Sequence, residues 1–153
     1  MWTKDRSLAL SIILVRALFV FIIILALCVP IMVHWYDITY TERIGLLDGS
    51  VFWPLSISLY VAAVCAEACL WFLGKLLLNI REDKVFIPEN CTLLRRISWC
   101  CLLAAIPFFV FGFWRFFAFV VALAAFFFGI ILRVVKNCFE KAVLLQEEND
   151  YTI

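Results

Sequence analysis

Two ionisable side chains, Arg16 and Glu67, lie well inside long apolar stretches of the sequence. A charge at that depth in a membrane helix costs about 2.5 to 3.5 kcal/mol on insertion scales, so each side chain is expected to have a partner. Counted along helices that run in opposite directions, both lie roughly 14 to 17 Å from the same end of their stretches. We therefore predict that Arg16 and Glu67 form an intramembrane ion pair.

The predicted pair has two interpretations. In the structural one, which we favour, the two charges largely neutralise each other and fix the packing register of the first two helices. In the functional one, Glu67 is a carboxylate that binds protons or cations in a small transporter or channel subunit. Small four-helix multidrug exporters use such a carboxylate, but theirs lies in the first helix, whereas Glu67 lies in the second apolar stretch.

The cysteine and histidine content gives little support for a redox enzyme or a metal centre. Seven cysteines are present, but no Cys-x-x-Cys pair occurs, and only Cys28 approaches the side that we assign below to the outside. His34 is the one histidine of the sequence. Disulfide chemistry needs exposed cysteine pairs, and zinc sites need closely spaced cysteine or histidine ligands. We expect the cysteines to be small apolar residues at helix contacts.

Other chemical motifs are also missing from the sequence. It has no glycine-rich phosphate loop, no serine, histidine and aspartate set, and no basic and aromatic surface for nucleic acid. We therefore predict a non-enzymatic protein with no catalytic residues, no cofactor, no metal and no direct contact with nucleic acid.

The elements that position these residues are four apolar stretches, which predict an integral membrane protein. About 20 helical residues cross a hydrocarbon core of about 30 Å. The hydrophobic fraction of 67% and the mean hydropathy of +1.07 are far above those of soluble proteins. We predict an all-α fold with one membrane domain, a bundle of four transmembrane helices with short loops. The predicted spans are residues 7–33, 51–78, 97–111 and 116–135, with a turn at residues 112–115.

The positive charges predict which side of the membrane each connection occupies. Lysine and arginine near span ends stay on the cytoplasmic side during insertion. The N-terminal tail, the loop 79–96 and the C-terminal end with its tail 136–153 carry most of them, whereas the opposite side has only Arg43 and Arg115. We predict a multi-pass protein of the cell membrane with both termini in the cytoplasm.

A basic collar is expected at the cytoplasmic ends of the third and fourth spans. It consists of Arg95, Arg96, Arg133 and Lys136. The favoured interpretation is contact with anionic lipid. Alternatively, the collar binds an acidic partner protein or the acidic tail of the chain itself. The acidic tail is defined by Glu147, Glu148 and Asp150.

Two segments carry a resemblance to a known family. They are Val85-Phe86-Ile87-Pro88-Glu89-Asn90 with Leu93-Leu94-Arg95-Arg96-Ile97, and the ending Leu145-Gln146-Glu147-Glu148-Asn149-Asp150-Tyr151-Thr152-Ile153. Both resemble segments of the bacterial four-span membrane proteins catalogued as domain of unknown function 2975, although Tyr151 stands where that family has leucine. The resemblance implies four spans and no assigned activity. It also implies that a small helix-turn-helix transcription regulator is often encoded nearby.

Both segments are predicted to lie on the cytoplasmic side, which favours a role that faces the cytoplasm. We predict an accessory or regulatory protein that contacts the lipid bilayer and a cytoplasmic protein partner, for which the resemblance suggests a helix-turn-helix regulator. The alternative is a small transporter or channel subunit that depends on Glu67. The predicted contact residues are the acidic tail and a cytoplasmic motif of Phe86, Glu89, Asn90, Leu94, Arg95 and Arg96.

Overall fold

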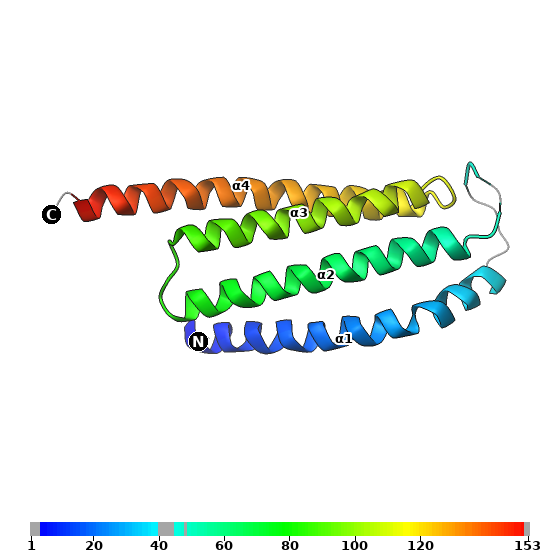
Figure 1. Ribbon diagram of the computed structural model, residues 1–153, viewed down its shortest axis with the longest axis horizontal. Helices are drawn as coiled ribbons and strands as arrows, with labels where there is room; N and C mark the ends of the chain where they lie inside the picture. Colours follow the sequence, from blue (N-terminus) through cyan, green and yellow to red (C-terminus); the bar gives the residue numbers. More distant parts are fainter. Residues whose placement is uncertain (1–3, 40–44, 48, 152–153) are drawn as a thin grey trace.

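The computed structural model describes residues 4–39, 45–47 and 49–151, and it consists of four α-helices (Figure 1). All four helices are long and apolar enough to cross a membrane. The predicted all-α class with four membrane-spanning helices is therefore confirmed. The helices are α1 Lys4–Thr39, α2 Phe52–Arg81, α3 Pro88–Phe111 and α4 Phe117–Tyr151.

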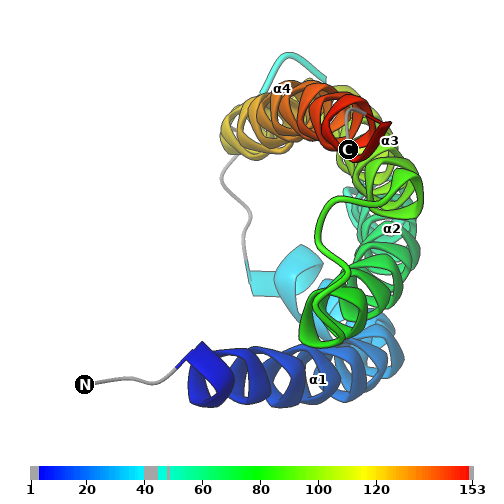
Figure 2. The same cartoon turned by 90° about the vertical axis from the view of Figure 1, so that its left-hand side faces the viewer.

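The helices are arranged in chain order as a curved row. α1 packs against α2, α2 against α3, and α3 against α4. Seen along the helix axes, the row bends into an open C with α1 and α4 at its two edges (Figure 2). This open curve differs from the compact packing expected for a bundle. Lipid tails are as apolar as leucine, so membrane helices gain little hydrophobic free energy by closing the row.

The two ends of the molecule are named here by what they contain. At the termini end lie the N-terminus, the α2–α3 loop and the C-terminus (Figure 1). At the hairpin end lie the α1–α2 and α3–α4 connections. The turn expected at residues 112–115 lies at the hairpin end, because α3 ends at Phe111 and α4 begins at Phe117.

The hairpin end is held by contacts between residues far apart in the sequence. The backbone N–H groups of Leu46 and Leu47 donate to the carbonyl oxygen of Phe113, at 2.8 and 3.0 Å. Gly45 permits this approach, because a Cβ atom there would overlap the carbonyl group of Trp114. Residues 45–47 therefore pack against the turn between α3 and α4.

Asp37, in the last turn of α1, contacts the residues that directly precede α2. Its carboxylate accepts hydrogen bonds from the Ser50 hydroxyl at 3.1 Å and from the Val51 N–H at 3.2 Å. Val51 directly precedes α2 and is buried in a cluster with Phe111 and Ala118. The level at which α2 starts is thereby tied to the end of α1.

α3 and α4 approach each other closely through small residues. The hydroxyl group of Ser98, only 2% exposed, donates to the carbonyl oxygen of Gly129 at 2.7 Å. A Cβ atom on Gly129 would lie only 2.8 Å from Leu102 Cδ2. Small residues at an interface let two helix backbones come together, which is how many membrane helices associate.

α4 continues past the start of α3 at the termini end. It reaches Tyr151, and its last turns project beyond the other helices in Figure 1. Just before this projection, a buried cluster of Leu76, Leu93 and Leu94, with Phe139 packed against it, joins α2, α3 and α4. The tail of α4 is therefore a helical projection on a packed base.

Candidate functional site

The structure corrects the predicted ion pair between Arg16 and Glu67. Arg16 lines a groove between α1 and α2 together with Gly74 and Lys75. A Cβ atom on Gly74 would lie 3.8 Å from a methyl carbon of Val15. Both carboxyl oxygens of Glu67 are buried and have no hydrogen-bond partner within the described part of the chain. Because Glu67 precedes Gly74 by seven residues, Arg16 lies about 10 Å from the level of Glu67.

The error arises from the register of the first two helices. α1 extends to Thr39, six residues beyond the predicted span end at Val33, which adds about 9 Å of helix. α2 begins at Phe52, close to its predicted start. The prediction instead took the opposite ends, residues 7 and 78, as level with each other. The contact between Val15 and Gly74 shows that they are not, and it places Arg16 nearer to the termini end of α2 than to Glu67.

Arg16 instead joins a set of basic residues at one level of the molecule. The guanidinium carbon of Arg96 on α3 lies 5.4 Å from the ring centroid of Phe72 on α2. That of Arg133 on α4 lies 4.8 Å from the ring centroid of Trp99 on α3. These contacts align the four helices at this level. We call the whole set the basic belt: Arg16, Lys75, Arg95, Arg96, Arg133 and Lys136.

Tryptophan side chains mark the same level and a second level near the hairpin end. Trp71 and Trp99 lie beside the basic belt, Trp35 and Trp53 lie toward the hairpin end, and all four are more than half exposed. Exposed tryptophans favour the membrane–water interface. Trp53 and Trp71 are 18 residues apart on α2, about 27 Å along a helix, close to the thickness of the hydrocarbon core. The spacing indicates that the basic belt, including Arg16, lies at one membrane surface.

Glu67 lies between these two levels as an isolated carboxyl group. It precedes Trp71 by one helical turn and shares a helix face with Gly74. Since Gly74 faces α1, Glu67 faces α1 as well, and the register places Ile22 opposite it. An ionisable residue inside a membrane helix is a functional candidate by default. Glu67 therefore remains a candidate functional residue although Arg16 is not its partner.

Asn90 holds the α2–α3 loop together and is 0% exposed. Its side-chain N–H₂ group donates to the carbonyl oxygens of Lys84 and Val85, both at 2.8 Å. Its amide oxygen accepts a hydrogen bond from Asn79 at 2.8 Å. Leu94, one turn further along α3, is also buried. These two members of the predicted contact motif are interior residues, so a partner cannot reach them.

The other four members of the motif are exposed. Phe86 is 45% exposed, and its ring packs on Phe139 with the centroids 5.8 Å apart. Glu89 is exposed in the first turn of α3. Arg95 extends toward α4 and Arg96 toward α2. The accessible part of the motif is therefore Phe86 in the loop with Glu89, Arg95 and Arg96 on α3, of which Arg95 extends toward α4.

Glu140 supplies negative charge to the basic belt. It forms ion pairs with Arg95 at 3.2 Å and with Lys136 at 2.6 Å. The acidic tail lies further along α4. Glu147 and Glu148 are exposed there, and the side chain of Asp150 lies outside the described residues.

A groove of about 440 Å³ lies between the start of α3 and the tail of α4. We call it the tail groove. Leu144 lines it and is 59% exposed, whereas Leu145, 66% exposed, is not part of the lining. A surface with exposed apolar residues and both signs of charge suits contact with another protein. The lining residues are Pro88, Cys91, Thr92, Arg95, Glu140, Val143, Leu144 and Glu147.

The structure brings cysteines from two helices together, which their spacing in the sequence does not reveal. Cys69 of α2 lies beside Cys100 and Cys101 of α3. Its thiol also lies 3.8 Å from the carbonyl oxygen of Ile97. Across the residues that the structure describes, no three His, Cys, Asp or Glu side chains are grouped so that they could hold a metal ion. These thiols lie at the contact between α2 and α3.

Four apolar helices, tryptophans at two levels and a basic belt at one of them define a multi-pass membrane protein. The chain belongs to the family described as "Protein of unknown function (DUF2975)", whose model matches residues 38–153. The resemblance stated from the two sequence segments is therefore confirmed. The match covers α2, α3, α4 and the last residues of α1. No curated protein and no solved structure matches the chain.

Proposed function

We propose that this chain is a non-enzymatic accessory or regulatory protein of the cell membrane that binds a protein partner on its cytoplasmic side. The observation that carries the proposal is the tail groove. α4 projects past the start of α3, so the groove and the exposed Leu144 are accessible at the termini end (Figure 1). Arg95, one of the exposed members of the predicted motif, lines the same groove.

The charge distribution supports a cytoplasmic termini end. The basic belt lies on that side of the apolar helices, and Arg6, Arg81 and Lys84 lie beyond it. At the hairpin end, Arg115 is the one basic residue of the described part of the chain. Because lysine and arginine are retained on the cytoplasmic side during insertion, both termini then face the cytoplasm.

The occupant that fits the tail groove is an amphipathic helix with basic residues on its polar side. Leu144 offers an apolar contact, and Glu147 lines the groove beside it. Glu89 adds a further exposed negative charge at the start of α3. Apolar anchors of an amphipathic helix seated in a groove are a common mode of recognition. The family resemblance makes a helix-turn-helix regulator the first partner to test.

The test compares two neighbouring leucines that share their chemistry and differ in position. Leu144→Glu places a charge in the tail groove, whereas Leu145→Glu places the same charge outside its lining. Co-purification of the partner from mild detergent is expected to be lost with Leu144→Glu and with removal of residues 146–153, and retained with Leu145→Glu. Identical partner profiles for all these proteins would exclude the docking function.

A second candidate is a small transporter or channel subunit centred on Glu67. One observation favours it, the buried carboxyl group with no hydrogen-bond partner among the described residues. Such a group can bind a proton or a cation during transport. In proteoliposomes, Glu67→Gln should abolish a proton-coupled flux, while the exposed-site control Glu89→Gln leaves it unchanged. Absence of flux in the wild-type protein, or equal flux with Glu67→Gln, would remove this candidate.

A further inference from the structure

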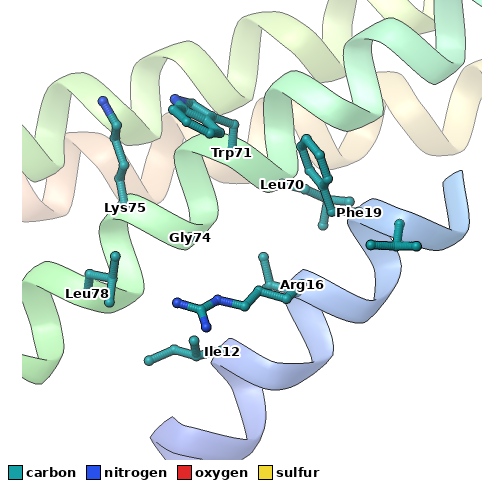
Figure 3. A pocket seen from close by; sticks show the side chains of 10 residues that line it. Ile12, Arg16, Phe19, Leu70, Trp71, Gly74, Lys75 and Leu78 are labelled. Carbon is teal, nitrogen blue, oxygen red and sulfur yellow. The ribbon is translucent and has the colours of Figure 1, made fainter. Parts of the chain in front are cut away.

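The groove between α1 and α2 combines apolar walls with two cationic side chains (Figure 3). Its volume is about 450 Å³. Arg16 reaches into it from α1, and Lys75 and Trp71 project beside each other from α2 (Figure 3). We propose that this groove binds an anionic phospholipid, whose phosphate is held by Arg16, whose attraction to the site is increased by the positive charge of Lys75, and whose acyl chain lies along the apolar wall. This site is separate from the tail groove.

The charge of the groove is not balanced by the protein. No acidic residue lines it, and within the described structure neither Arg16 nor Lys75 takes part in an ion pair. The ammonium group of Lys75 instead lies 5.6 Å from the ring centroid of Trp71. Basic pockets between membrane helices on the cytoplasmic side bind the head groups of anionic lipids. Arg16 therefore matches a lipid phosphate, and Lys75, whose side chain points away from Arg16 in Figure 3, adds a second positive charge to the lining.

The α3–α4 pair offers a comparison at the same level. A groove of about 220 Å³ lies between α3 and α4, and its lining likewise contains basic residues, namely Arg95, Arg133 and Lys136. In that groove Arg95 and Lys136 share the carboxylate of Glu140, and Arg133 stacks on Trp99. The protein itself supplies the anion between α3 and α4, whereas between α1 and α2 it does not.

The shape of the α1–α2 groove also follows the structure of a phospholipid. Phe19, Val20 and Leu70 line it on the side toward the hairpin end, which is the membrane interior. Gly74 has no side chain and keeps the groove open beside Val15. A phospholipid presents its charged phosphate at the membrane surface and its hydrocarbon below, in the same order as these residues. A free phosphate ion would leave the apolar wall unused.

The test is a lipid titration of the purified full chain in detergent, read by native mass spectrometry. The wild-type protein is expected to bind phosphatidylglycerol in preference to phosphatidylcholine, and excess inorganic phosphate should not displace the lipid. Arg16→Gln combined with Lys75→Gln should weaken phosphatidylglycerol binding roughly thirtyfold, from the usual contribution of two basic residues. The matched control, Arg81→Gln combined with Lys141→Gln, removes the same charge from two exposed positions outside the basic belt and should change the affinity less than about threefold.

Three results would overturn the proposal. They are unchanged phosphatidylglycerol affinity in the Arg16 and Lys75 variant, an equal loss in the control variant, and displacement of the lipid by inorganic phosphate. If the first variant is not recovered in a folded state, Gly74→Leu provides a second test. It fills the groove while keeping both cations, so unchanged lipid affinity in this variant would also contradict the proposal.

Discussion

Val15 of α1 lies against Gly74 of α2, because a Cβ atom on Gly74 would be 3.8 Å from Val15 Cγ1. At the hairpin end, Asp37 accepts a hydrogen bond from Val51 at 3.2 Å. From the second contact to the first there are 22 residues along α1 and 23 along α2, so both describe one antiparallel register. This register places Arg16 in the basic belt and leaves Glu67 without Arg16 as a partner. The proposed lipid site depends on the same register.

Paired cysteines test this register directly. We expect Val15→Cys with Gly74→Cys to form a disulfide on mild oxidation, detected by peptide mass spectrometry. Arg16→Cys with Glu67→Cys should not, because an offset of about 10 Å exceeds the Cα separation of about 4.4 to 6.8 Å that a disulfide spans. A link in the second pair and none in the first would restore the register predicted from the sequence.

The stability effects of Arg16 and Glu67 are expected to be independent. Residues separated by more than about 7 to 10 Å with no shared partner usually show additive effects within about 0.5 kcal/mol. The free energy of unfolding in mixed micelles would be measured for Arg16→Leu, Glu67→Leu and the double variant. A coupling above about 1 kcal/mol would contradict the separation of the two side chains.

The number and class of the helices were predictable from the sequence, because apolar runs long enough to span a bilayer leave few alternatives. The end of α1 was not. Polar and aromatic residues from His34 to Thr39 read as the end of a span, yet they continue the helix. Asp37 contributes to this through its contact with Val51, which no local pattern encodes. The register of α1 against α2, fixed by contacts such as Val15 with Gly74, separates Arg16 from Glu67.

Gly129 is expected to be intolerant of a side chain, unlike Gly74. An added methyl group on Gly129 would meet Leu102 at 2.8 Å and 2.9 Å in the contact between α3 and α4, whereas on Gly74 it would meet Val15 at 3.8 Å. Gly129→Ala should destabilise the protein by about 1–3 kcal/mol through overpacking. Gly74→Ala should be neutral or slightly stabilising, since alanine favours a helix by about 1 kcal/mol. Equal unfolding free energies of the two variants would contradict the described α3–α4 contact.

Asn90 is expected to stabilise the α2–α3 loop rather than to contact a partner. Asn90→Asp keeps the acceptor for Asn79 but removes the donor to the Lys84 and Val85 carbonyls. Leaving buried acceptors unpaired costs about 1–3 kcal/mol, so proteolysis within residues 82–87 should become faster. The exposed neighbour Glu89→Gln serves as the control. Unchanged proteolysis in Asn90→Asp would refute this role.

The site could be predicted only in part, because exposure depends on which side of a helix its neighbours cover. The cytoplasmic motif was identified as one unit, but packing divides it into buried Asn90 and Leu94 and exposed Phe86 and Glu89. Lys75 was missed. Its signal in the sequence is a single charge four residues after Trp71 in an apolar run. Its meaning became clear only when the fold placed Arg16 and Lys75 in the lining of one groove.

The membrane orientation is the claim on which the docking proposal most directly depends, and thiol labelling of intact cells tests it. Leu46→Cys and Lys84→Cys each place an exposed thiol at one end of the molecule. Labelling with a membrane-impermeant maleimide is compared with that of the parent protein, which carries the seven native cysteines. We predict labelling at position 46 in intact cells and at position 84 only after the membrane is permeabilised. Labelling at position 84 in intact cells, with protection at position 46, would contradict a cytoplasmic tail groove.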